Sequence, residues 1–138
     1  MPTINYHLKE LEIAKNPNDP RHSLPTIPSN VNYILDVCCG LGQILLASNI
    51  INPKIFQCGV DQDFTAVLHG SRSTDNVHFV CASGDALPFA RDSFDMIICR
   101  AGLPYMNIPL ALKSFFYVLQ PGGYLWLTLH NYRSVTRY

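Results

Sequence analysis

The chain has 138 residues, of which 48% are hydrophobic and 14% charged, so it is long enough to form one compact core under a surface of low charge. Its ten basic and ten acidic side chains cancel and form no block of one sign, which argues against a nucleic acid or an anionic membrane as partner. No apolar run approaches the ~20 residues of a membrane span, and the amino terminus does not resemble a leader, so we expect a cytoplasmic protein.

Two regions follow from the sequence pattern. Residues 1–30 predict an amino-terminal helix at 7–14 and then an extended segment, NPNDPRHSLPTIPSN, which is rich in proline and turn-forming residues. Residues 31–138 alternate short apolar runs with helical stretches, which predicts one α/β domain with a mostly parallel sheet. The expected strands cover 33–37, 55–60, 77–81, 95–99 and 124–129, and the expected helices cover 43–49, 64–70 and 108–119. We expect the last helix to end at Pro121-Gly122-Gly123.

The first expected strand runs into a glycine-containing turn, ILDVCCGLGQ. Asp36 precedes the turn, Gly40 and Gly42 lie within it, and a helix is expected to follow. Such a turn lets the backbone approach a ligand closely, and the helix offers free N–H groups. The same pattern also occurs in nicotinamide and flavin enzymes, and glycines in a loop are often only structural.

The second expected strand ends in GVDQD, which places Asp61 at its carboxyl end. Because the carboxyl ends of neighbouring parallel strands border one crevice, this carboxylate can accept hydrogen bonds from both hydroxyls of a ribose. Alternatively, Asp61 only caps the helix that is expected to begin near Asp63. The five cysteines show no spacing typical of a metal site, so no metal is expected.

The later segments carry a family resemblance. The third and fourth expected strands are joined by GDALPFARDSFDMIICR, and the fifth follows ALKSFFYVLQPGGYLWLTL. In order and spacing these segments resemble the later motifs of class I S-adenosylmethionine-dependent methyltransferases, over residues 33–129. The resemblance implies a three-layer Rossmann-like fold, S-adenosylmethionine as cofactor, and a methyltransferase activity.

The resemblance also implies roles for the residues at the turns. Asp36 would face the methionine amino group, the loop glycines would let the backbone approach the adenosine, and Asp61 would hold the ribose hydroxyls. The turn from Ser83 to Asp85 would line the adenine, with the choice of contacting residue left open. The implied cofactor-binding residues are Asp36, Cys38, Gly40, Gly42, Asp61, Gln62, Ser83, Gly84, Asp85 and Arg100.

The sequence departs from the family pattern in two places. Cys38 stands where the family commonly has glycine, and we expect this side chain to lower the affinity for the cofactor. The family's sheet usually continues past the fifth strand, so we expect a sheet truncated there, with the carboxyl-terminal strands missing. The fifth strand would then be an apolar edge, which predicts a homo-oligomer formed through this edge.

The leading functional hypothesis is a methyltransferase acting on a small-molecule acceptor, because the sequence shows no basic stripe for nucleic acid. The alternative is a non-catalytic cofactor-binding or oligomerisation module with the same fold. A nicotinamide-dependent oxidoreductase is disfavoured, since Leu45 stands where the third glycine of G-x-G-x-x-G would be. No catalytic residue is assigned, although His130, Tyr105 and Tyr132 are candidate bases by position.

Overall fold

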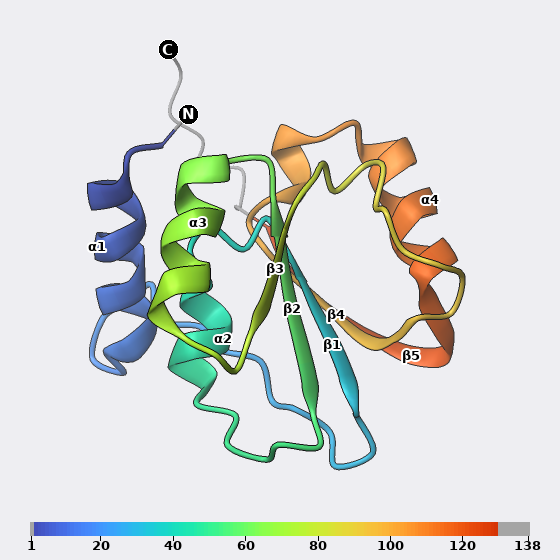
Figure 1. Cartoon of the computed structure of the whole chain (residues 1–138), viewed down its shortest axis with the longest axis horizontal. Coiled ribbons are helices and arrows are strands. Elements are labelled where there is room, and N and C mark those ends of the chain that lie inside the picture. The colour runs from blue at the N-terminus through green and yellow to red at the C-terminus, as the bar shows by residue number, and fades with distance from the viewer. Residues whose placement is uncertain (1, 130–138) are drawn as a thin grey trace.

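The computed structural model describes residues 2–129, which form a three-layer α/β fold (Figure 1). Three helices cover one face of a five-stranded parallel sheet, and α4 covers the other face (Figure 1). The helices are α1 (Ile4–Lys15), α2 (Gln43–Ser48), α3 (Phe64–Ser73) and α4 (Ile108–Val118), with a 3-10 turn, η1, at Leu103–Tyr105. The strands are β1 (Tyr33–Val37), β2 (Phe56–Asp61), β3 (His78–Cys81), β4 (Phe94–Arg100) and β5 (Leu119–Thr128).

The strand order, β3-β2-β1-β4-β5, creates a reversal in the middle of the sheet. From β1 the chain moves outward through β2 to β3, and then crosses back to β4 on the other side of β1. In sheets of this type, ligands bind in the crevice at the carboxyl ends of the strands where the order reverses. A ligand site is therefore expected at the loops that leave β1, β2 and β4.

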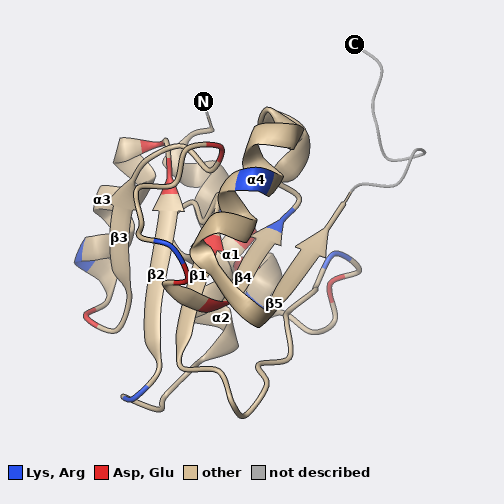
Figure 2. Ribbon diagram, turned by 90° about the vertical axis from the view of Figure 1, so that its right-hand side faces the viewer, with Lys and Arg blue, Asp and Glu red and all other residues tan. Residues whose placement is uncertain are grey.

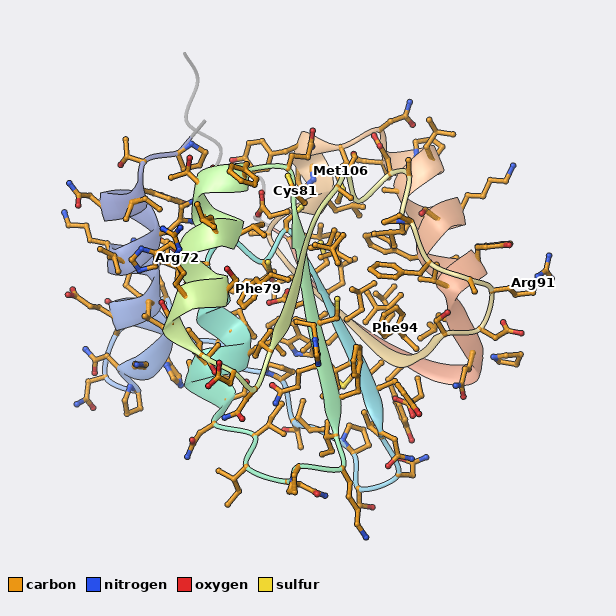
Figure 3. All side chains as sticks on the ribbon, in the orientation of Figure 1. Arg72, Phe79, Cys81, Arg91, Phe94 and Met106 are labelled. Carbon is orange, nitrogen blue, oxygen red and sulfur yellow. The ribbon has the colours of Figure 1, made fainter. Side chains whose placement is uncertain are left out.

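The core explains why the strands are nearly continuous apolar runs. Leu35, Cys58 and Ile97 point from the sheet toward Phe115 of α4, in a buried cluster on that face. A second cluster joins the opposite face of the sheet to α1 and α2, and includes Ile34 and Ile98 among its fully buried members. Figure 3 shows Phe94 inside the molecule between the sheet and α4, whereas Arg91 points outward.

The predicted fold class is confirmed, and the boundaries of the elements differ mainly at β5. This strand begins at Leu119 rather than at residue 124, because Leu119 pairs with Phe94 directly after α4 ends. The Pro121-Gly122-Gly123 segment lies within β5, and the pairing register shifts there between Phe94 and Met96. Gly122 supports this irregularity with a φ of 77°.

The amino-terminal helix is longer than predicted. It begins at Ile4, because the hydroxyl of Thr3 caps it by accepting a hydrogen bond from the Tyr6 N–H at 3.3 Å. Two of the other helices begin at capping residues of the same kind, since Asp63 caps α3 and Asn107 caps α4, whereas α2 follows Gly42 without a side-chain cap. The predicted division at residue 30 stays a prediction.

Figure 2 shows the positions of the charged residues spread along the ribbon, over helices and loops. In this view neither sign of charge is confined to one part of the described chain, in agreement with the equal numbers of basic and acidic residues. Within residues 2–129, no helix is both long and apolar enough to cross a membrane.

Candidate functional site

The glycine turn after β1 is fastened to the end of β2 by Asp61. The Gly40 N–H donates to Asp61 Oδ2 at 2.8 Å, and the Asp63 N–H donates to Asp61 Oδ1 at 2.9 Å. Because each carboxylate oxygen can accept more than one hydrogen bond, both oxygens keep capacity for a ligand hydroxyl. The helix-capping alternative for Asp61 is wrong, since Asp63 is the residue whose side chain accepts from Ala66 N–H at the start of α3.

Asp36 is a buried carboxylate with an unsatisfied oxygen. Its side chain lies near the carboxyl end of β1 with 1% of the residue exposed, and Oδ2 has no hydrogen-bond partner within the described residues. Burial raises the pKa of Asp36 well above its usual value, and the proximity of Cys99 and Asp61 raises it further, while Arg100 opposes this shift. A cationic donor placed against Oδ2 would satisfy this oxygen and favour the charged carboxylate.

The two loop glycines make room for the protein's own side chains. A Cβ on Gly40 would lie 2.5 Å from Gln43 Oε1 and 2.7 Å from His7 Nδ1, and a Cβ on Gly42 would lie 2.9 Å from the Phe79 ring. Both glycines also have positive φ, 58° and 98°, which L residues rarely adopt. A side chain at either position would therefore collide with the protein's own side chains, so internal packing alone favours glycine there, and the approach of this backbone to a ligand stays a prediction.

Cys38 occupies the turn under conformational strain. Its φ is 60°, and its sulfur lies 4.0 Å from Met106 Sδ. Hydrogen bonding to Cys99 and burial raise the pKa of Cys38, so this thiol stays neutral. The left-handed conformation is costly for a residue with a side chain, and Cys38 adopts it directly after β1, next to the point where the strand order reverses.

The turn after β3 lies beside the end of β2. Ala82 N–H donates to the Asp61 carbonyl at 3.0 Å, which places the beginning of this turn beside the end of β2. Ser83 Oγ donates to Asp85 Oδ1 at 2.6 Å. Ser83 and Asp85 are the two alternatives for the adenine contact, and this hydrogen bond joins them. Gly84 is buried, because a Cβ there would lie 2.5 Å from Met106 Sδ and 2.6 Å from Val37 Cγ1.

Two other predicted residues lie at the ends of strands. Gln62 follows β2, its side chain is exposed, and its carbonyl accepts from Cys81 Sγ at 3.5 Å. Figure 3 shows Cys81 and Met106 at the same end of the sheet. Arg100 follows a different pattern: its guanidinium donates to Glu10 Oε2 at 3.1 Å and to the Arg21 carbonyl at 3.2 Å, and so ties the amino-terminal segment to the end of β4.

Sequence reasoning missed two residues of the site, His7 and Gln43. The His7 side chain is buried beside the glycine turn, with Nε2 3.2 Å from Asp63 Oδ2 and Nδ1 3.1 Å from Gln43 Nε2. Gln43 Oε1 is buried without a partner within the described residues. No motif signals this cluster, because it joins residues 36 and 56 positions apart in the chain.

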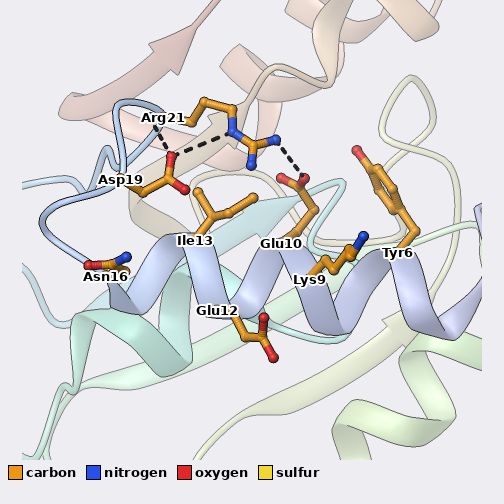
Figure 4. Close-up of a pocket in the computed structure, with 8 residues that line it drawn as sticks. All are labelled: Tyr6, Lys9, Glu10, Glu12, Ile13, Asn16, Asp19 and Arg21. Carbon is orange, nitrogen blue, oxygen red and sulfur yellow. Dashed lines mark hydrogen bonds and ion pairs between the residues drawn. The ribbon is translucent and has the colours of Figure 1, made fainter.

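A hollow of about 420 Å³ lies along α1 and the segment that follows it (Figure 4). Tyr6, Glu10, Ile13, Asp19 and Arg21 are among its lining residues, and Arg21 pairs with Asp19 and Glu10 (Figure 4). The hollow does not include the glycine turn or Asp61. The candidate site is therefore identified by polar atoms that lie close together and lack partners, not by a cavity. These atoms are acceptors, so a ligand that binds them must supply hydrogen-bond donors.

The assembled site is a rim at the carboxyl ends of the strands that offers hydrogen-bond acceptors. Asp36 Oδ2 and Gln43 Oε1 need donors, and the Asp61 carboxylate lies between the turn and β2 with capacity for hydroxyls. The predicted residues from β1, β2 and the turn after β3 are thus brought together, whereas the Arg100 side chain points to α1. Such a rim suits a ligand that carries an ammonium group and vicinal hydroxyls.

Comparisons with known proteins identify relatives of this chain. Residues 34–123 match the model of a methyltransferase domain family. The malonyl-[acyl-carrier protein] O-methyltransferase of Marinomonas sp. is 31% identical over 74% of the chain, and the human mitochondrial arginine-hydroxylase NDUFAF5 is 32% identical over 70% of it. A solved structure of a SAM-dependent methyltransferase from Methanosarcina mazei has a TM-score of 0.59 and 27% identity over 73% of the chain. The chain spans only 40%, 28% and 53% of these three proteins, respectively.

Proposed function

Since the chain belongs to the S-adenosylmethionine-dependent methyltransferase family, we propose that it binds this cofactor across the carboxyl ends of β1, β2 and β3. We further propose that it directs the cofactor's methyl group to a small-molecule acceptor. The observation that carries the proposal is the buried, unsatisfied Oδ2 of Asp36 beside a turn that is fastened to Asp61.

The residues of the rim fit the groups of this cofactor. Asp36 Oδ2 would accept from the methionine ammonium, which supplies the cationic donor that this oxygen lacks. Asp61 would accept from the two ribose hydroxyls with the lone pairs that Gly40 and Asp63 leave free, and Gln62 would lie beside the sugar. The joined Ser83 and Asp85 side chains and the backbone of Gly84 would line the adenine.

When bound, the cofactor supplies a methyl group already activated by a sulfonium, so the protein's residues contribute mainly positioning and a site shielded from water. Asp36 would orient the methionine end at the reversal of the sheet, near Cys38 and Arg100. A base for the acceptor stays unassigned. Tyr105 is 82% exposed, and the two other candidates, His130 and Tyr132, lie outside the described residues.

A small-molecule acceptor is supported by the charge distribution, because ten basic and ten acidic residues without a basic stripe give no footprint for nucleic acid. The test has two steps. Calorimetric titration with S-adenosylhomocysteine is expected to show one site per chain, and turnover with a panel of small hydroxyl, amine and thiol acceptors is expected to identify a substrate. Turnover only with a protein or RNA acceptor would contradict this part of the proposal.

A second candidate function, a cofactor-binding module without methyl transfer, is supported by one observation: strained Cys38 stands in the turn where close backbone approach is expected. Methyl transfer to an acceptor distinguishes the two functions. A chain that binds S-adenosylhomocysteine but transfers no methyl group to any acceptor would favour the module.

Cys38→Gly is expected to raise the affinity for S-adenosylhomocysteine by about threefold to tenfold. Glycine removes the thiol from the turn where close approach of the backbone to the cofactor is expected, and it adopts the observed φ of 60° readily. Calorimetry measures the change, with Cys38→Ser as the control, because serine keeps both the side chain and the strain. Equal affinities of Cys38→Gly and the wild type would show that this residue does not limit binding.

We also propose that the outer edge of β5 pairs with a second copy of the chain. Among the described residues, β5 is hydrogen-bonded to β4 alone, and the side chains of Tyr124, in the middle of the strand, and Leu129, directly after it, are exposed. Unpaired apolar edges associate readily. Multi-angle light scattering is expected to give a dimer at micromolar concentration and a monomer after Leu129→Lys, whereas a monomeric wild type would contradict the proposal.

A further inference from the structure

A buried polar chain connects α1 to the glycine turn. His7 of α1 is 5% exposed, and each of its ring nitrogens has one partner: Asp63 Oδ2 at 3.2 Å from Nε2, and Gln43 Nε2 at 3.1 Å from Nδ1. A carboxylate can only accept, so His7 Nε2 carries a hydrogen and donates it to Asp63. In the neutral ring Nδ1 is then an acceptor, and the Gln43 amide must present its NH₂ group to it.

This arrangement fixes where the amide oxygen of Gln43 points. With Nε2 held by His7, Oε1 faces away from the imidazole, and it is buried without a partner among the residues described. The amide lies directly against Gly40, where a Cβ would be 2.5 Å from Oε1 and 2.7 Å from Nε2. A buried acceptor that lacks a donor is costly, and such atoms in folded proteins require an explanation.

The second unsatisfied oxygen of the described chain is Asp36 Oδ2, at the other end of the same turn. The two unsatisfied atoms, Asp36 Oδ2 and Gln43 Oε1, are both acceptors, and their residues flank the turn at 37–42. A single ligand that donates hydrogen bonds along the turn would satisfy them together, as the ammonium and hydroxyl groups of the proposed cofactor can.

We propose that Gln43 is a further cofactor-binding residue, whose Oε1 accepts a hydrogen bond from the cofactor, and that His7 is the positioning residue that holds the Gln43 amide in this orientation. The inference rests on the proposed function. His7 acts through Gln43 and Asp63 and touches no ligand itself. In this account α1 contributes to cofactor affinity through one relay, Asp63–His7–Gln43, in addition to covering α2.

A double-mutant cycle in calorimetric titrations with S-adenosylhomocysteine tests the relay. Gln43→Leu is expected to weaken binding about tenfold, which is the effect of one hydrogen bond. His7→Phe keeps a ring of similar size and is expected to weaken binding about threefold, because the Gln43 amide is then free to rotate. In the double variant His7→Phe is expected to add nothing to the effect of Gln43→Leu, since its influence passes through that amide.

His22→Phe is the matched control. His22 also contacts α1, because its Nδ1 lies 3.4 Å from the Ile13 carbonyl, but this contact is far along the helix from His7 and the glycine turn. This variant is expected to lower the unfolding temperature and leave the affinity unchanged. A purely structural role of His7 would make the two histidine variants alike.

A second measurement needs no variant. In the ¹⁵N spectrum of the wild-type chain, the side-chain NH₂ resonances of Gln43 are expected to shift on addition of S-adenosylhomocysteine, whereas those of Gln57, which donates to the Ile50 carbonyl, are expected to stay in place. Unchanged Gln43 resonances, wild-type affinity of Gln43→Leu, or additive effects of the two substitutions would overturn this inference alone. A wild-type chain that does not bind S-adenosylhomocysteine would overturn the proposed function as well.

Discussion

Asp61→Ala is expected to weaken binding of S-adenosylhomocysteine about 100-fold. The substitution removes both carboxylate oxygens that would accept from the ribose hydroxyls, and hydrogen bonds to a charged group contribute about 1.5–3 kcal/mol each. It also releases the Gly40 N–H, which Asp61 Oδ2 holds at 2.8 Å, so the turn loses its anchor to β2. Isothermal titration calorimetry measures the affinity directly.

Two controls separate recognition from folding. Asp75→Ala removes one carboxylate from an exposed position between α3 and β3 and is expected to leave the affinity unchanged. Asp61→Asn keeps one acceptor oxygen and is expected to fall between the wild type and Asp61→Ala. Equal binding by the wild type and a folded Asp61→Ala variant would contradict the assignment of the ribose.

Asp36→Asn is expected to have opposite effects on stability and binding. In the cofactor-free chain the substitution removes a buried carboxylate whose Oδ2 is unsatisfied, so the free energy of unfolding at neutral pH is expected to rise by about 1–3 kcal/mol. The affinity for S-adenosylhomocysteine is expected to fall about 10-fold to 100-fold, because the methionine ammonium loses its charged partner.

The stability of the cofactor-free chain is expected to fall with rising pH because of Asp36. Burial raises the pKa of folded Asp36 above its unfolded value of about 3.9, so the unfolded chain loses this proton first as the pH rises. The contribution of Asp36 to stability is therefore fully present below that unfolded value and is lost as the pH rises through the higher folded pKa. Thermal unfolding of the cofactor-free chain between pH 4 and 8 is expected to show this loss in the wild type and not in Asp36→Asn.

Asp95→Asn is the matched control for the stability measurement. The Asp95 carboxylate accepts hydrogen bonds from the Asn32 and Tyr33 N–H groups, both at 2.9 Å, so its neutralisation is expected to destabilise the chain. Destabilisation of the cofactor-free chain by Asp36→Asn would contradict the account of an unsatisfied carboxylate.

Most helices and strands could be predicted from the sequence, because the apolar runs and capping residues agree with the burial that the structure shows. The apolar runs at β1 and β4 are buried on both faces, and the capping residues Asp63 and Asn107 begin the helices near the predicted positions. At β5 the signals disagree. Pro121-Gly122-Gly123 is typical of a turn, but the pairing of Leu119 with Phe94, 25 positions earlier in the chain, extends the strand across it.

The site was predictable only in part. Asp61 and the turn were found because a strand end and a glycine pattern are local features, and their contact follows from parallel pairing of β1 with β2. The relay through His7 has no such local signal, because its hydrogen bonds join α1 to residues that are distant in the sequence, Gln43 and Asp63. The filling of the space at Gly40 by His7 and Gln43 was missed for the same reason.

If the cofactor lies along the carboxyl ends of β1, β2 and β3, backbone amide shifts in ¹⁵N spectra will locate it there residue by residue. On titration with S-adenosylhomocysteine, the largest shifts are expected at Gly40, Gly42, Asp61, Gln62 and Gly84. A hollow of about 270 Å³ at the opposite end of the sheet, lined in part by Lys54, Phe56 and His78, serves as the internal comparison. Largest shifts around that hollow, with an unchanged glycine turn, would contradict the account.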